Sequence, residues 1–194
     1  MVSSNESTLR VFCAIEIPEN IRQRISQHAQ QLHEVLPDVQ ASWTKPDNIH
    51  LTLKFFGNIS QQQGLKASEA AARAVDGLGS FAIRVEGAGS FPPRGPAKVL
   101  WIGINDPTGK LIQLQQKFES ECEREGFPKE ARAFHPHLTV ARLRTARGAR
   151  ALAEQHKQLG FEGGDVSVSS LILFRSELSS KGSTYTRIST HRLG

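Results

Sequence analysis

Two histidine–threonine pairs are the first candidates for chemistry in this chain. The stretch His50 to Leu53 (HLTL) returns as His137 to Val140 (HLTV). If both are strands, residues i and i+2 point to the same side, so each histidine shares a face with its threonine. An imidazole acts as acid or base near neutral pH, and a positioned pair can divide the two tasks. Threonine hydroxyls can donate hydrogen bonds to anionic oxygens, which suits a phosphorus centre.

Strict alternation also predicts the surroundings of the first pair. Leu51, Leu53 and Phe55 are expected to enter a core. Lys54 has the same parity as His50, so we expect its ammonium to add positive charge to the face that carries the pair.

A basic run, composed of Arg142, Arg144, Arg147 and Arg150, follows the second pair. The last three are equally typical of a solvated loop and helix face. Arg142 comes five residues after His137, so alternation places it on the opposite face. Only a twist or bulge at the strand end would turn it toward the histidine.

A metal site is the less favoured interpretation of the second pair. His135 and His137 could place two imidazoles on one face, but the sequence offers no third ligand, and Asn48 stands at the position of His135 in the first copy. The chain also lacks an H-E-x-x-H motif, a G-x-S-x-G elbow and a P-loop. We therefore predict no metal and no cofactor.

Size and charge limit the classes of protein that fit. The 194 residues predict one domain, and the formal charge of +5 with a pI near 9.5 suits a polyanionic partner. No apolar run approaches the roughly 20 residues that span a bilayer, and the first ten residues, MVSSNESTLR, lack the basic start and long apolar stretch of a secretory signal. We expect a monomeric cytoplasmic protein. Cys13 and Cys122 are expected to be reduced core residues.

The elements that must position the two pairs are predicted in the same order twice. The first half gives strands at 10–17, 50–57 and 81–88 and helices at 19–36 and 60–75. The second half gives strands at 99–104, from His137 and at 166–174, with helices from Asp106 to before Gly126 and at 146–159; a last strand is expected at 185–188.

The intervals between matching elements are nearly equal in the two halves, which indicates an internal duplication. We therefore predict a single α+β domain over 1–194, made of two pseudo-twofold lobes at about 10–90 and 97–190, and an exchange of terminal strands between the lobes stays open. Such an arrangement brings the histidine strands face to face, with a central cleft between the lobes as the ligand site.

Four longer strings resemble a known family: NIHLTLKFFG, FHPHLTVAR, FPPRGPAKVLW and LFRSELSSKGSTYTRI. Together they are similar to the RNA 2′,3′-cyclic phosphodiesterases of the two-histidine (2H) phosphoesterase superfamily, once called 2′-5′ RNA ligases. The resemblance covers almost the whole chain from Arg10. It implies two mainly antiparallel sheets that face each other across the cleft, with helices on the outside.

The resemblance also implies a reaction, the metal-independent hydrolysis of a terminal 2′,3′-cyclic phosphate on RNA or a nucleotide to a 2′-phosphate. By motif, His50 would be the proton donor and His137 the proton acceptor. Thr52 and Thr139 would hold the phosphate oxygens, and Arg142 would contact the phosphate.

Three questions stay open at this level. The two motifs are nearly identical, so the residues alone do not say which histidine is the acid. A nucleotide-binding module without turnover and reversible 2′-5′ RNA ligation at the same site are the alternative functions. The aromatic residues that could stack on a base read better as core; they are Trp43, Phe56, Phe134 and Tyr185.

Overall fold

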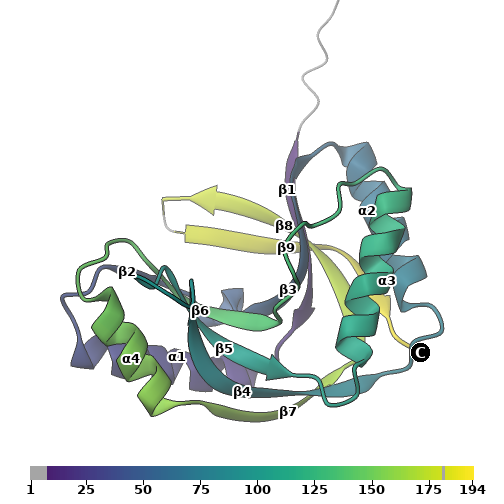
Figure 1. Ribbon diagram of the computed structural model, residues 1–194. Coiled ribbons are helices and arrows are strands. Elements are labelled where there is room, and N and C mark those ends of the chain that lie inside the picture. Colours follow the sequence, from purple (N-terminus) through teal and green to yellow (C-terminus); the bar gives the residue numbers. More distant parts are fainter. Residues whose placement is uncertain (1–7, 181) are drawn as a thin grey trace, which may run out of the picture.

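A computed structural model describes residues 8–180 and 182–194 of the chain. It contains two antiparallel sheets (Figure 1). The four-stranded sheet has the order β3 (His50–Ile59), β1 (Leu9–Glu16), β8 (Ser170–Ser179), β9 (Gly182–Arg192). The five-stranded sheet has the order β2 (Ala41–Trp43), β6 (His137–Leu143), β5 (Val99–Asn105), β4 (Phe81–Phe91), β7 (Glu162–Val168).

Four α-helices lie on the outside of the two sheets (Figure 1). Helices α1 (Glu19–Val35) and α4 (Ala149–Leu159) pack together against the five-stranded sheet, whereas α2 (Gln61–Val75) and α3 (Lys110–Arg124) pack together beside the four-stranded one. A short 3-10 helix, η1 (Pro46–Asn48), precedes β3. The predicted α+β class, with antiparallel sheets and outer helices, is confirmed.

The apolar faces of the sheets and helices form the main core, to which nearly every element contributes. Cys13 and Cys122 lie fully buried in it as free thiols, as expected. A second, smaller cluster lies on the cleft side of the four-stranded sheet and includes Phe12 and Phe174. Among the described residues, no helix has both the length and the hydrophobicity needed to cross a bilayer.

Several predicted boundaries are wrong. The strand expected at 166–174 is broken at Ser169, so that its first part ends β7 and its second part begins β8 in the other sheet. Helix α3 begins at Lys110 rather than beside Asp106, although the Asp106 carboxylate still accepts a hydrogen bond from the amide of Ile112 at 3.1 Å. The last strand runs far beyond 185–188, and β2 was not predicted.

Neither sheet is built from one half of the sequence. The first half contributes β2 and β4 to the sheet that contains β5, and the second half contributes β8 and β9 to the sheet that contains β1. The two motif strands end up in different sheets, and β3 of one sheet contacts β6 of the other.

Candidate active site

A β-bulge shapes the first histidine strand. In the pairing of β1 with β3, Ala14 lies opposite Thr52 and Cys13 opposite Lys54, so Leu53 is an extra residue without a partner. An extra residue reverses the alternation beyond it. His50 and Thr52 keep the cleft face, but after the bulge Lys54 turns inward and Phe55 turns to the cleft.

The second histidine strand has its bulge at the same place. Trp101 pairs with Thr139 and Leu100 with Ala141, so Val140 is the extra residue of β6. Ala141 is fully buried. Beyond the bulge Arg142 therefore lies on the cleft face with His137, although simple alternation along the strand places it on the opposite face.

One cavity of about 350 Å³ is lined by predicted site residues from both sheets. Its lining includes His50 and Thr52 from β3 and His137, Thr139 and Arg142 from β6. Two imidazoles, two hydroxyls and a guanidinium around one space can bind an anion and move protons at both of its ends. In the described residues Arg142 forms no ion pair, so its charge is available to a ligand.

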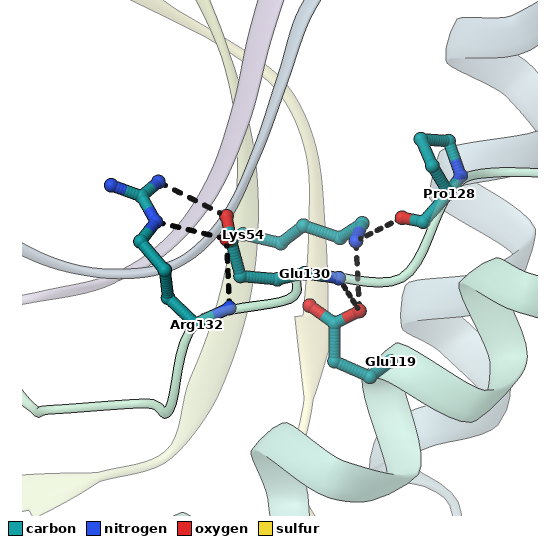
Figure 2. Close-up of polar contacts among 5 residues, drawn as sticks. All are labelled: Lys54, Glu119, Pro128, Glu130 and Arg132. Carbon is teal, nitrogen blue, oxygen red and sulfur yellow. Dashed lines mark hydrogen bonds and ion pairs between the residues drawn. The ribbon is translucent and has the colours of Figure 1, made fainter.

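The expectation that Lys54 shares the face of His50 and Thr52 is wrong, because the bulge at Leu53 sends its side chain the other way. Its exposed fraction is only 7%. The ammonium donates hydrogen bonds to the carboxylate of Glu119 in α3 at 2.8 Å and to the carbonyl of Pro128 at 2.9 Å (Figure 2). Lys54 thus fastens β3 to the start of the segment that leads to β6.

Both catalytic candidates are oriented by a carbonyl two residues upstream. The Nδ1 of His137 lies 2.6 Å from the carbonyl oxygen of His135, to which it donates its proton. His50 forms the corresponding hydrogen bond with the backbone of Asn48. For His137 this contact fixes the tautomer and leaves Nε2 for a ligand. The position of His135 therefore acts through its backbone, which explains why asparagine replaces it in the first copy.

The surroundings of the two imidazoles differ. His50 stacks on Phe12, with ring centroids 4.6 Å apart, and meets the edge of Tyr185 at 5.3 Å. Burial among these rings lowers the pKa of His50 to about 4, against the hydrogen bond to Asn48, which raises it. Burial also lowers the pKa of His137, and the nearby Arg142 charge lowers it further, against the His135 hydrogen bond.

Sequence reasoning missed part of the lining. Phe12 and Phe55 both line the cavity although their strands read as core, and Arg10 lies beside them. Of the four aromatic candidates for stacking, Tyr185 lines the cavity, whereas Phe56 packs against Phe118 and Phe127. Phe55 reaches the cavity through the bulge of β3, which leaves no trace in the periodicity. Arg10 and Phe12 share one face of β1 by ordinary alternation, and that pattern could have predicted them.

Two other members of the basic run, Arg144 and Arg150, form local contacts. Arg144 donates to the hydroxyl of Ser42 in β2 at 2.8 Å, and Arg150 pairs with Glu154 one turn further along α4 at 2.8 Å. In the described part of the chain, no group of three or more histidine, cysteine or acidic side chains could hold a metal ion.

Comparison with known proteins agrees with this arrangement. The model of a family described as the 2′-5′ RNA ligase superfamily matches residues 18–179. The chain belongs to this superfamily. A Methanothermobacter thermautotrophicus protein named RNA 2′,3′-cyclic phosphodiesterase is 33% identical over 186 residues, covering 95% of this chain and 99% of that protein. An Escherichia coli protein of the same name is 33% identical over 133 residues, covering 69% of this chain and 71% of its own length.

The superfamily fold is also found among solved structures. Escherichia coli LigT in complex with 3′-AMP has a TM-score of 0.76 and 26% identity, and the match covers 96% of this chain and 99% of LigT. The structural match therefore extends over both sheets.

Proposed function

We propose that this protein hydrolyses terminal 2′,3′-cyclic phosphates of RNA or nucleotides to 2′-phosphates, by a two-histidine acid–base mechanism that needs no metal. The observation that carries the proposal is the cavity in which both histidine–threonine pairs meet Arg142. Relatives of similar length carry the name RNA 2′,3′-cyclic phosphodiesterase, and LigT has been solved with a nucleotide.

The chemistry assigns a task to each side chain. His137 takes a proton from water, whose oxygen forms a bond to phosphorus. The bond from phosphorus to the 3′ oxygen breaks, and His50 gives that oxygen its proton, so the phosphate stays on the 2′ oxygen. Thr52 and Thr139 donate hydrogen bonds to the non-bridging oxygens, and Arg142 balances their charge. Attack and departure lie on opposite sides of phosphorus, as two facing strands allow.

The charges around the two rings support this division. A base must be neutral before it accepts a proton, and Arg142 beside His137 disfavours the cationic imidazole. His50 has no such cation among the causes of its lowered pKa, which is due to burial. A bound phosphodiester carries negative charge, which favours the protonated form of His50 and restores the acid that the reaction needs.

The test is to follow a 2′,3′-cyclic nucleotide by phosphorus NMR in EDTA. We expect the cyclic signal to be replaced by that of a 2′-monophosphate. His50→Ala and His137→Ala should each lower the rate by about 10²- to 10⁴-fold, whereas His33→Ala, an exposed histidine on α1, serves as the matched control. An unchanged signal, a need for added metal, or a 3′-phosphate product would contradict the proposal.

The same samples separate the alternatives. Tight retention of a nucleotide without turnover would indicate a binding module. Joining of cyclic-phosphate and 5′-hydroxyl RNA ends would indicate ligation at this site, with the hydroxyl in the place of water.

A further inference from the structure

Phe55 occupies an unusual place in the cavity wall. It is the first residue that the bulge of β3 turns to the cleft, and Arg142 holds the equivalent position after the bulge of β6. One site therefore has a guanidinium on one side and an aromatic ring on the other. The ring is 49% exposed, which is unfavourable for a phenylalanine that has no ligand to cover it.

Arg10 completes this part of the wall. Its guanidinium carbon lies 4.6 Å from the centroid of the Phe55 ring, a cation–π contact, and both side chains line the cavity that holds the two histidines. In the described residues Arg10 pairs with no carboxylate, so its donors are free for a phosphate. We call Arg10 and Phe55 together the platform.

The platform lies beyond His50 along a row of rings. Phe12 stacks on His50 at 4.6 Å between centroids, and on its other neighbour, Phe55, at 6.5 Å with 19° between the ring planes. Phe55 also lines a second cavity of about 480 Å³, which shares Thr52, His137 and Arg142 with the first. There is thus space beside the ring that continues from the phosphate site.

We propose that the platform binds the nucleotide next to the terminal one, so that the enzyme prefers RNA ends of two or more nucleotides to mononucleotides. This rests on the proposed function: if His50 protonates the departing 3′ oxygen, the terminal ribose lies at His50. The preceding nucleotide then extends along the ring row to the platform. Its base stacks on Phe55, which tolerates any base because each has a π face, and Arg10 contacts its phosphate.

The test compares a mononucleotide with a dinucleotide that carries the same terminal 2′,3′-cyclic phosphate. The ratio of kcat/KM values, dinucleotide over mononucleotide, should exceed one for the unmodified protein. Phe55→Leu keeps an apolar side chain but removes the π face, so the ratio should fall roughly tenfold. Phe55→Tyr keeps the ring and should keep the ratio. Arg10→Gln should lower the ratio and weaken its dependence on salt.

Measuring the binding of the reaction products tests the platform without any need for turnover. The dissociation constants of 2′-phosphate-terminated mono- and dinucleotides should show the same preference and the same loss in Phe55→Leu. If neither cyclic substrate is hydrolysed but the binding preference holds, the proposed function fails and the platform stands. Equal affinity for both lengths, or an equal loss for both in a Phe55→Leu protein that melts like the unmodified one, would overturn the platform.

Discussion

The two histidines share a motif but not an environment. His50 lies among Phe12, Phe174 and Tyr185, whereas His137 lies near Arg142 and meets the ring edge of Phe91 at 5.2 Å. Nearly identical tetrapeptides therefore place their histidines among different neighbours. The surroundings thus distinguish the two histidines, which the motifs alone do not.

The pH dependence of the reaction follows from these pKa values. In the proposed mechanism one histidine is protonated and the other neutral, and burial lowers the pKa of both below the usual 6.5, to about 4 for His50. A lowered pKa means that the proton of the acid is lost at a lower pH. We expect kcat/KM, which reports the free enzyme, to be greatest between about pH 4 and 6.5.

The profile of kcat reports the complex and should lie at higher pH, because the bound anion stabilises the imidazolium. Both profiles can be measured at constant ionic strength on a 2′,3′-cyclic nucleotide. A kcat/KM that keeps rising above pH 7 would contradict the lowered pKa values.

At the level of elements, two equal bulges decide which side chains reach the cavity. Leu53 and Val140 are each the fourth residue of their tetrapeptides, and each reverses the alternation of its strand. Without them Lys54 would face the cleft and Arg142 the core. Because of the bulges, Arg142 rather than Lys54 lies at the cavity. The buried Lys54 instead links β3 to α3 and to the segment before β6 through two hydrogen bonds.

The buried ion pair between Lys54 and Glu119 leads to a prediction about stability. Lys54 and Glu119 are both buried, and the second carboxylate oxygen of Glu119 has no partner in the described residues. Lys54→Met leaves that carboxylate buried without its counter-charge, which should lower the free energy of unfolding by about 3–5 kcal/mol. Lys54→Met combined with Glu119→Leu removes both charges and should recover most of the loss.

Urea unfolding of the two variants and the unmodified protein measures this difference. The hydrogen bond to Pro128 is lost in both variants, so its absence does not affect the comparison. A double variant as unstable as the single one would show that the buried pair itself stabilises the fold.

At the level of the whole molecule, the halves hold each other in place. Each sheet takes strands from both halves, and α1 and α4, which come from different halves, meet at a buried pair of histidines. His156 donates through Nε2 to the carbonyl of Trp101 at 2.9 Å, and in the neutral ring its Nδ1 then accepts from Nε2 of His28 at 2.7 Å. Burial lowers the pKa of both rings and so favours their neutral forms in the folded protein.

The pair should make the fold sensitive to acid. Burial, with the charge of His156 as a second cause, lowers the pKa of His28 from 6.5 to about 4, and burial lowers that of His156. Between these pH values the unfolded chain binds more protons than the folded one, so stability is present above pH 6.5 and declines as the pH falls toward 4. His28 contributes at most about 3 kcal/mol to this decline.

His28→Gln retains an N–H donor toward His156 and removes one of the depressed imidazoles. Its free energy of unfolding should therefore fall less steeply than that of the unmodified protein between pH 7 and pH 4. Denaturant unfolding at several pH values provides the measurement, and equal slopes would show that His28 already carries a proton in the fold.

The sequence by itself determined the candidate residues for the chemistry and most of the order of the elements. Residue types and local spacing, which need no tertiary contact, revealed the two histidine–threonine pairs, the repeated order of strands and helices, and the antiparallel α+β class through the resemblance to a family. Helix α2 shows that a local signal was enough to place an element, since Ser60 and Gln63 form the capping box that the sequence predicts.

The tertiary structure decided which side chains meet. Bulges at Leu53 and Val140 depend on how neighbouring strands pair, and alternation within one strand contains no information about an extra residue. For this reason Arg142 entered the site, Lys54 left it and Phe55 was exposed there. The passage of the chain between sheets at Ser169 likewise depends on distant partners, because β7 pairs with β4 and β8 with β1.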